Sequence, residues 1–263
     1  MPVKTFIVTG ASSGIGRAIA DLFHAHGHKV IGVSRRKPQD DIAWLHKACD
    51  ISKPSEVKLL IAHLPSVIDG VVHAAGIGVG GAVERIEDKA LEKLINVNLY
   101  GVNRINKAMI PLLSRGDQPT IIHIGSLAGI FPIPFQAHYA MSKAALMHYS
   151  DALRLELAPT PIRVTTVLLG DVKTAFTTSR EHYFLKQDDR YGERPKRSID
   201  KMARDEAKGM SANYVAKHVV RLIEKKRVPS CKTVGLMYKS MVFAAKILPR
   251  RFMLFIVYRL YGR

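Results

Sequence analysis

The sequence is poor in cysteine, in acidic residues and in long unbroken apolar runs. It has two cysteines, Cys49 and Cys231, among 263 residues. This scarcity excludes a disulfide framework and a CxxC metal site, and it favours a reducing, cytoplasmic compartment and no bound metal. No charged segment leading into an apolar one opens the chain, so we expect no secretion signal. Since 47% of the residues are hydrophobic, the length suits one domain with a large core.

Acidic residues number 22 against 40 lysines and arginines, which gives a formal net charge of +18. Such a charge favours anionic partners, namely phosphate-bearing cofactors, nucleic acids or acidic membrane surfaces. The basic residues are spread along the chain, with denser runs at residues 194–204, 224–227 and 246–251. Because no nucleic-acid motif accompanies these runs, we predict no specific nucleic-acid partner. A solvated basic surface is the alternative explanation of the charge.

Glycine is concentrated in the stretch Thr9–Gly16, TGASSGIG, between a strand expected at residues 5–8 and a helix expected at residues 15–26. Glycine has no Cβ and tolerates positive φ, so such a turn lets the backbone approach a pyrophosphate closely. The opening turn of the helix then offers unpaired N–H groups and the positive end of its dipole. A tight turn without a ligand is the alternative. The predicted phosphate contacts are Gly10, Ser12, Ser13, Gly14, Ile15 and Gly16.

A second buried strand is expected at Lys29–Ser34, and Arg35 and Arg36 follow directly at its end. An acidic residue at this point would bind the ribose hydroxyls of NAD, whereas an arginine neutralises the 2′-phosphate of NADP. We therefore predict NADP(H) as the cofactor, with Arg35 as the main contact. The alternative is a solvated pair of surface arginines.

The helical pattern between Ile86 and Leu113 contains NVNLYG at residues 96–101. Asparagine is a poor mid-helix residue because its amide competes for backbone hydrogen bonds, so this stretch predicts a distorted turn. Asn98 is then either an ordinary buried asparagine or a functional one. Ser126 follows a strand expected at residues 120–125, at the sheet edge where ligands of open parallel sheets bind. A turn or capping role for Ser126 is the alternative.

Tyr139 and Lys143 are four residues apart and share one face of a helix that continues to about Leu157. A tyrosine of ordinary pKa is a weak acid or base at neutral pH, and a nearby ammonium group lowers that pKa. The pair can then exchange a proton with an alcohol or ketone oxygen, which Ser126 can also hydrogen-bond. The spacing alone is equally typical of a solvated helix face.

The order of these features resembles the short-chain dehydrogenase/reductase family of the classical type over residues 5–174. The resemblance implies an α/β fold, a single doubly wound Rossmann domain with a mostly parallel sheet. It implies a catalytic tetrad of Asn98, Ser126, Tyr139 and Lys143. In that tetrad, Asn98 bonds a backbone carbonyl and holds a water, and Lys143 reaches the nicotinamide ribose.

The resemblance also extends the set of cofactor contacts around the sheet edge. Two departures from the family pattern are His73-Ala74, where an asparagine is usual, and Leu169-Gly170, where Pro-Gly is usual. The first removes a side-chain hydrogen bond, and the second makes the geometry of the following loop uncertain. Beyond the glycine turn, the implied contacts are Ser34, where NAD-preferring relatives tend to carry Asp, and Arg35, Arg36, Asp50, Ile51, Ala75, Gly76, Tyr139, Lys143, Val172 and Thr174.

The rest of the chain predicts a strand at residues 163–169, a variable segment at 175–210, a helix at 213–225 and a last strand at 232–236. The resemblance implies that the variable segment closes over substrate, and its mixture of aromatic and charged residues is typical of a lid. An exposed connection is the alternative. We therefore divide the chain into a catalytic domain, residues 1–236, and a C-terminal extension, residues 237–263.

The extension is apolar and basic. Lys246, Pro249, Arg250 and Arg251 interrupt its apolar runs, so we predict no membrane-spanning helix there. Apolar side chains interleaved with cations favour a helical segment lying on a membrane surface. Two alternatives are that the extension covers the substrate cleft or packs in an oligomer interface.

These features together predict an NADP(H)-dependent oxidoreductase that interconverts a ketone and a secondary alcohol, with Tyr139 moving the proton. The apolar extension favours a steroid- or lipid-like substrate, although small or polar carbonyls stay open. A non-catalytic NADPH-binding protein at a membrane is the rival interpretation. The family resemblance implies a homodimer or homotetramer, located in the cytoplasm or peripherally on a membrane.

Overall fold

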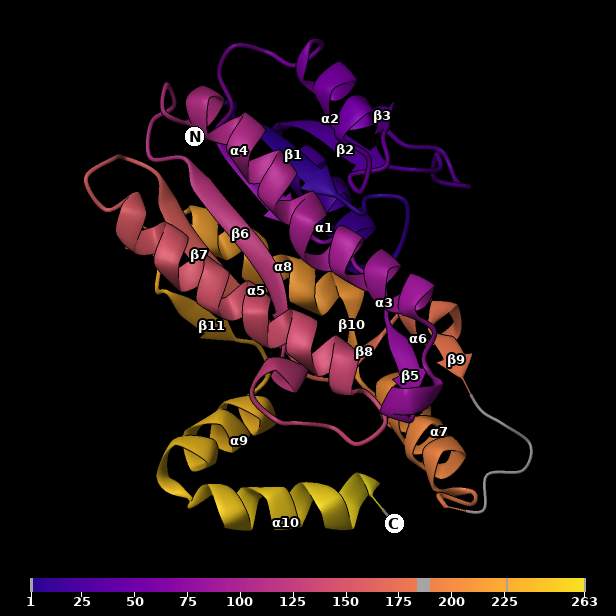
Figure 1. The fold of residues 1–263 in the computed structure, drawn as a ribbon. Coiled ribbons are helices and arrows are strands. Elements are labelled where there is room, and N and C mark those ends of the chain that lie inside the picture. Colours follow the sequence, from indigo (N-terminus) through magenta and orange to yellow (C-terminus); the bar gives the residue numbers. More distant parts are fainter. Residues whose placement is uncertain (1, 184–189, 226, 263) are drawn as a thin grey trace.

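The computed structural model describes residues 2–183, 190–225 and 227–262. Within them, a parallel seven-stranded sheet forms the centre of the molecule, in the order β11-β7-β6-β4-β1-β2-β3 (Figure 1). This order runs outward in both directions from β1 and β4, as the predicted doubly wound fold requires. The strands are β1 (Thr5–Thr9), β2 (Lys29–Ser34), β3 (Leu45–Ala48), β4 (Gly70–His73), β6 (Thr120–Ser126), β7 (Arg163–Leu169) and β11 (Cys231–Thr233).

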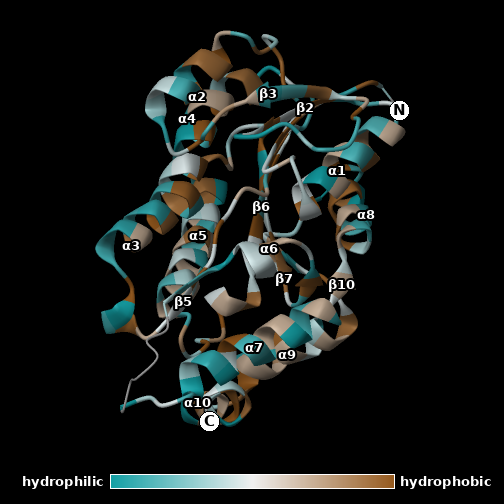
Figure 2. Cartoon of the chain, turned by 90° about the vertical axis from the view of Figure 1, so that its right-hand side faces the viewer, coloured by the Kyte–Doolittle hydropathy of each residue, from teal (hydrophilic) through white to brown (hydrophobic). Residues whose placement is uncertain are grey.

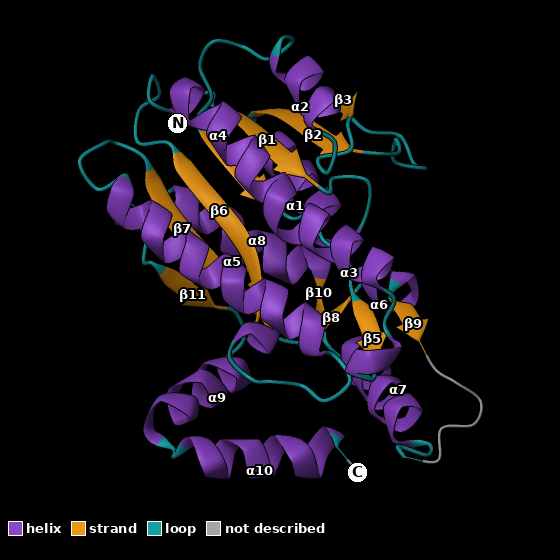
Figure 3. Ribbon diagram, viewed as in Figure 1, coloured by secondary structure: helices purple, strands orange, loops and turns teal. Residues whose placement is uncertain are grey.

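Helices cover both faces of the sheet, so its central strands are buried on both sides (Figure 3). In β1, Phe6 and Val8 belong to the core under one layer of helices, and Ile7 belongs to the core under the other. The first layer is α1 (Gly14–Ala25) and α8 (Ala212–Ile223), and the second includes α2 (Pro54–Ile61), α4 (Val102–Leu113) and α5 (Ala137–Glu156).

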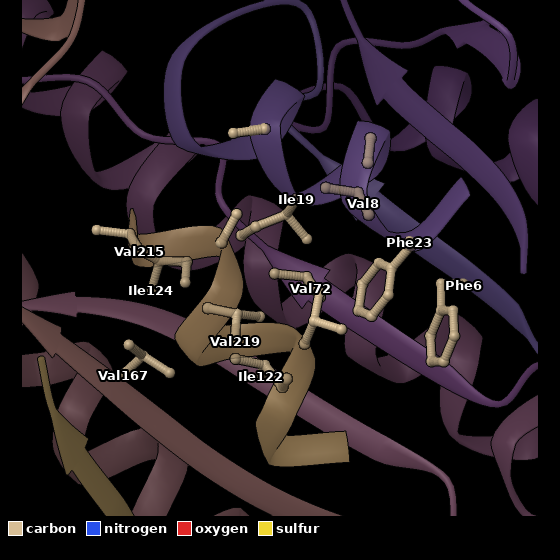
Figure 4. Close-up of a cluster of buried hydrophobic side chains, with 14 of the residues drawn as sticks. Phe6, Val8, Ile19, Phe23, Val72, Ile122, Ile124, Val167, Val215 and Val219 are labelled. Atoms are coloured by element: carbon tan, nitrogen blue, oxygen red, sulfur yellow. The ribbon is translucent and has the colours of Figure 1, made fainter. Parts of the chain in front are cut away.

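In Figure 4, Phe6 and Phe23 lie at one end of the core beneath α1 and α8, and the other labelled side chains are aliphatic. The rings of Phe6 and Phe23 stack with their centroids 4.2 Å apart, and neither ring is exposed. Val215 and Val219 of α8 are also fully buried in this core. Burial of each such side chain stabilises the fold by roughly 1.5–3 kcal/mol, which holds α1 against the glycine turn that precedes it.

The predicted distortion at residues 96–101 is confirmed. A π-helical segment, Asn96–Gly101, joins α3 (Asp88–Ile95) to α4. Gly101 is required there, because a Cβ at this residue would lie 2.8 Å from Cγ1 of Ile51. The wide turn carries the buried Asn98 toward the carboxyl edge of the sheet.

The variable segment contains regular structure. It includes α6 (Phe176–Ser179), β9 (Glu181–Tyr183), α7 (Arg194–Ala207) and the first residue of β10 (Met210–Ser211). Two small parallel ladders join it to the sheet edge, since β9 pairs with β5 (Val79–Gly81) and β10 pairs with β8 (Val172–Lys173). Residues 184–189 of the segment lie outside the described part of the chain.

The C-terminal extension forms two helices, α9 (Leu236–Ile247) and α10 (Arg250–Tyr261), which lie across one end of the molecule (Figure 1). The predicted last strand is wrong at its end, because β11 stops at Thr233. Gly235 adopts a φ of +88°, and Leu236 already begins α9. Among the helices described, none is both long and apolar enough to cross a membrane.

A buried network of polar side chains lies on one face of the sheet, where β4 and β6 pack against α4 and α5. Nε2 of His73 lies 2.7 Å from Oδ1 of Asn106, whose Nδ2 lies 3.0 Å from Nε2 of His123. Nδ1 of His123 in turn lies 2.9 Å from the hydroxyl of Ser150. Since the Asn106 oxygen accepts and its amide nitrogen donates, His73 donates through Nε2 and His123 accepts through Nε2, which holds the His123 imidazole neutral.

This histidine pair predicts a loss of stability in mild acid. Burial lowers the pKa of His73 to about 4 and the pKa of His123 well below its ordinary value. The unfolded chain therefore binds more protons once the pH falls below about 6.5. We expect the free energy of unfolding to fall between pH 6.5 and 4, by roughly 3 kcal/mol for His73 alone. Urea unfolding at a series of pH values measures this, and His73→Asn should flatten the curve. An unchanged slope in that variant would contradict the assignment.

Candidate active site

A cleft of about 1190 Å³ opens at the carboxyl ends of the strands. This is the edge of a doubly wound sheet at which ligands bind. The structure brings all the predicted site residues to this cleft except Asn98, which lies buried behind its wall. Those that line it are Gly10, Ser12, Ser13, Gly14, Ile15, Gly16, Ser34, Arg35, Arg36, Asp50, Ile51, Ala75, Gly76, Ser126, Tyr139, Lys143, Val172 and Thr174.

The glycine turn fits a bound diphosphate. Gly10 and Gly14 have φ values of +68° and +56°, and a Cβ at Gly10 would lie 2.7 Å from the backbone nitrogen of Ala75. The backbone of the turn therefore packs against the backbone at Ala75, and the residues of the turn also line the cleft. Ser13 precedes α1 without capping it through its side chain, and the first turn of α1 has no acidic residue. The N–H groups of this turn are thus suited to receive phosphate oxygens.

Arg35 and Arg36 stand exposed on the rim of the cleft, directly after β2. Ser34 is buried, and its hydroxyl donates to the backbone oxygen of Arg36 at 2.8 Å and lies 3.0 Å from Nε2 of His46. The Ser34 hydroxyl therefore makes its hydrogen bonds within the protein. Its bond to Arg36 fixes the turn on which the two guanidinium groups stand.

Asp50 lies on the same rim. Its carboxylate accepts hydrogen bonds from the backbone N–H of Ser52 at 2.9 Å and from the Ser52 hydroxyl at 2.7 Å. Burial raises the pKa of Asp50, but these two bonds and the charges of Arg35 and Lys53 outweigh it, so the pKa lies below its ordinary value. Asp50 is therefore anionic at neutral pH, beside the cationic Arg35.

Tyr139 and Lys143 project into the cleft from one face of α5, as their spacing predicts. The ammonium nitrogen of Lys143 lies 5.8 Å from the centroid of the Tyr139 ring and donates to the backbone oxygen of Ile124 at 3.0 Å. Only 7% of Lys143 is exposed, and burial lowers its pKa to about 8. Lys143 is thus a cation at neutral pH that can lose its proton in mild alkali.

The predicted effect of Lys143 on the pKa of Tyr139 is not seen. Burial raises the pKa of Tyr139 to about 12. A hydrogen bond with Ser126 and the charge of Arg180 lower this pKa, but by less than burial raises it. Lys143 has turned its ammonium group to the carbonyl of Ile124, and the tyrosine loses more hydration than its neighbours restore. Tyr139 therefore carries its hydroxyl proton at neutral pH, which is the form that can protonate a carbonyl oxygen.

Ser126 is fixed beside Tyr139 by its own backbone. It precedes a 3-10 turn at Leu127–Gly129, and its hydroxyl oxygen accepts a hydrogen bond from the N–H of Ala128 at 3.1 Å. The predicted capping role and the predicted position beside Tyr139 are thus both present. One oxygen atom placed between the Ser126 and Tyr139 hydroxyls could be hydrogen-bonded by both.

Asn98 is a positioning residue in this geometry. Its Oδ1 accepts from the N–H of Ile77 at 2.9 Å, and its Nδ2 donates to the oxygen of Ile77 and the hydroxyl of Ser142, both at 3.1 Å. The predicted bond to a backbone carbonyl is therefore present. The Asn98 amide also binds the N–H of the same residue, so two hydrogen bonds join Asn98 to Ile77. Together with the bond to Ser142, these hydrogen bonds hold the loop after β4 against α5, at the helical turn that carries Lys143.

Gly170, which follows the departing Leu169, is required by a contact that the sequence alone did not indicate. A Cβ at Gly170 would lie 2.2 Å from the ring of Tyr238, which comes from α9. The hydroxyl of Tyr238 donates to Oδ2 of Asp171 at 2.9 Å and accepts from the N–H of Asp171 at 3.1 Å. The extension is therefore joined to the loop that carries Val172 and Thr174.

A buried ion pair in the variable segment also escaped the sequence interpretation. Arg180, 4% exposed, pairs with Glu206, which also accepts a hydrogen bond from Thr177 at 2.5 Å. The guanidinium carbon lies 5.7 Å from the Phe176 ring centroid, which lies 5.8 Å from that of Tyr139. Arg180 and Glu206 are 26 residues apart, so no local pattern could have joined them.

Comparison with known proteins agrees with this geometry. Residues 4–183 match the family model described as short chain dehydrogenase. A 3-ketodihydrosphingosine reductase of Bacteroides thetaiotaomicron is 31% identical over 240 residues, which are 89% of each chain. The chain therefore belongs to the short-chain dehydrogenase/reductase family. It is an oxidoreductase that acts on CH–OH or C=O groups with a nicotinamide cofactor.

Two further relatives extend the comparison. The NADPH-dependent 1-acyldihydroxyacetone phosphate reductase of Schizosaccharomyces pombe is 34% identical over 182 residues, covering 65% of this chain and 60% of that protein. The structure of ligand-free aldohexose dehydrogenase from Thermoplasma acidophilum is 26% identical, with a TM-score of 0.74 over 88% of this chain and 92% of that one. The fold and the lipid-related character of the sequence relatives thus agree with the prediction.

Proposed function

We propose that this protein uses NADPH to reduce a ketone on an apolar, lipid-like substrate to a secondary alcohol. The observation that carries the substrate class is the wall of the cleft. Side chains of α9 and α10 line the same cleft as Tyr139, and all but the two tyrosines among them are aliphatic or thioether side chains. Two relatives named above are reductases of lipid-related ketones, which supports the same class.

The preference for NADP(H) rests on the rim at Arg35 and Arg36. Two exposed guanidinium groups follow β2, where an acidic residue would favour the ribose hydroxyls of NAD. Arginine suits a phosphate because its N–H groups match the oxygens in pairs. Solved relatives include a serine dehydrogenase complexed with NADP+, which is 25% identical to this chain.

A nicotinamide cofactor bound in the cleft would supply the hydride for the carbonyl carbon, and the residues of this chain would handle the proton. Tyr139 donates its hydroxyl proton to the carbonyl oxygen, while Ser126 hydrogen-bonds that oxygen as negative charge develops. Once its ammonium group leaves the carbonyl of Ile124, the buried Lys143 can stabilise the tyrosinate left behind. Asn98 keeps the loop after β4 against α5, and so keeps Lys143 in reach of the tyrosine.

A series of methyl ketones of increasing chain length tests the proposed reaction. Each buried methylene contributes about 0.8 kcal/mol, so kcat/KM with NADPH should rise roughly fourfold per carbon until the apolar wall is covered. Leu260→Ser, in the wall, should flatten the rise, and Leu236→Ser, 82% exposed and away from the cleft, serves as the matched control. Faster turnover of small polar ketones would overturn the lipid-like substrate. NADPH binding without any turnover would favour a binding protein.

We also propose a homodimer or homotetramer, as is common in this family, and a cytoplasmic location with peripheral attachment to a membrane. The attachment is supported by the composition of the extension, which is apolar and basic. Light scattering of the purified chain measures its mass in solution, and a monomer at all concentrations would contradict the oligomer.

A further inference from the structure

The helices α9 and α10 present two different faces. On α10, the side chains that line the cleft are Met253, Ile256, Val257, Leu260 and Tyr261, which recur at helical spacing on one side. Phe252 and Phe255 of the same helix do not line the cleft, and they are 50% and 57% exposed. The two helices therefore form a thin partition between the cleft and the outside of the molecule.

The outer side of this partition is unusually apolar for an exposed surface. Six large side chains that do not line the cleft are between 50% and 82% exposed. They are Leu236, Met237, Phe243, Ile247, Phe252 and Phe255. Figure 2 shows hydrophobic and hydrophilic residues alternating along these helices, at the end of the molecule away from β2 and β3. So many exposed large apolar side chains on two neighbouring helices are typical of a docking face.

Basic residues surround these apolar side chains. Residues 236–262 contain five lysines and arginines and no aspartate or glutamate. Next to Phe243, a depression of about 270 Å³ is lined by Lys232, Lys239 and Lys246. Burial and the charges of Lys239 and Lys225 lower the pKa of Lys232, which shows that cations are crowded there. The face therefore complements a negatively charged partner.

An anionic lipid bilayer meets both requirements. Its headgroups attract the lysines and arginines, and its interface accepts the phenylalanine and leucine side chains. A second copy of the chain fits less well, because a twofold contact through this face would set basic residues against basic residues. The apolar and basic residues also lie on the same two helices, as an interfacial segment requires.

The cleft and the outer face are continuous. Met241, Ile256 and Leu260 line the cleft and are still 38%, 37% and 49% exposed. Tyr261 donates to Oδ2 of Asp205 at 3.1 Å, and Nε of Arg194 donates to the oxygen of Gly262 at 2.8 Å, so α10 is held in place by α7. The partition is thus anchored at its far end by α7 and, through Tyr238, at its near end by the loop at Asp171.

From these observations we infer that α9 and α10 lie on an anionic membrane leaflet and that the apolar substrate passes from the leaflet into the cleft along their inner faces. The passage of substrate from the leaflet into the cleft, which we call the route, rests on the function proposed above. The docking of α9 and α10 on the membrane rests only on their outer face. The two parts can therefore be tested separately on the same protein.

Docking is tested by flotation of the NADP+-loaded protein with two kinds of vesicle. One is phosphatidylcholine alone, and the other contains phosphatidylserine at about 30 mol %. The unmodified protein should bind the anionic vesicles at least about tenfold better than the neutral ones. Phe243→Ser with Phe255→Ser should remove most of this binding, as should Arg250→Gln with Arg251→Gln. Leu155→Ser on α5, 75% exposed, is the matched control and should bind normally.

The route is tested by turnover. The Phe243/Phe255 double variant should reduce a short water-soluble ketone at the normal rate, because neither residue lines the cleft. It should reduce a long-chain ketone embedded in anionic vesicles about tenfold more slowly. Equal loss on both substrates, or on neither, would overturn the route. Absence of flotation by the unmodified protein would overturn docking, as would a double variant that changes only the oligomeric mass. Failure of every ketone would overturn the proposed function instead.

Discussion

Replacing Tyr139 with phenylalanine should lower kcat/KM for ketone reduction by about 10²–10⁴-fold, with NADPH binding unchanged. The substitution removes one hydroxyl and leaves the ring, which packs 5.8 Å from Phe176 between centroids. The lost hydroxyl is the proposed proton donor, and in that mechanism Ser126 alone does not protonate the carbonyl oxygen. Steady-state kinetics with the best ketone of the series, together with NADPH titration by fluorescence, measure the two effects separately.

A matched control for Tyr139 is present on the same helix. Tyr149→Phe removes a hydroxyl that accepts from Asn106 at 3.2 Å and donates to Asn103 at 3.3 Å, and Tyr149 does not line the cleft. This control should lose stability, since Asn106 loses a partner, yet keep its turnover. Near-normal turnover in Tyr139→Phe, or an equal loss in Tyr149→Phe, would show that another group moves the proton.

The electrostatics of the site explain why a tyrosine needs its neighbours here. With burial holding the pKa of Tyr139 at about 12, the tyrosinate formed during reduction is unfavourable unless cations stabilise it. Arg180 and Lys143 both lie near, and the pKa of Lys143 is itself lowered to about 8. Because Lys143 loses its charge as the pH rises through that value, we expect the tyrosinate to lose support in alkali.

Local sequence patterns predicted the parts of the site that depend on neighbours in the chain. The glycine turn was predictable because strand, turn and helix follow within a few residues. The π-helical segment was predictable because asparagine and Gly101 disfavour a regular helix at that point. The Tyr139–Lys143 pair was predictable because residues four apart share a helix face.

Features that depend on distant residues were beyond that kind of prediction. The space that Gly170 leaves is filled by Tyr238, 68 residues later, and Gly235 ends the last strand earlier than its apolar character indicated. Three uses of the extension were open from the sequence. The structure shows that α9 and α10 wall the cleft, because folding brings them back across the carboxyl edge of the sheet.

The rim at Arg35 gives the second large expected effect. Arg35→Asp should raise the Kd for NADPH by about 10–100-fold, because it removes a charged hydrogen-bond donor worth about 1.5–3 kcal/mol and adds a repelling carboxylate. NADH has no 2′-phosphate, so its Kd should stay level or fall as the new carboxylate meets the ribose hydroxyls. Binding of both cofactors, measured by protein-to-cofactor fluorescence transfer, gives the ratio directly.

A matched charge reversal separates direct contact from the general field of a protein with a net charge of +18. Lys29→Asp makes the same change at the other end of β2, where the side chain is exposed and does not line the cleft. Six residues of extended chain put it about 20 Å from Arg35, beyond the Debye length of about 10 Å in 0.1 M salt. The control should leave both dissociation constants unchanged. If Lys29→Asp weakened NADPH binding as much as Arg35→Asp does, or if neither variant weakened it, the 2′-phosphate would not be bound at Arg35.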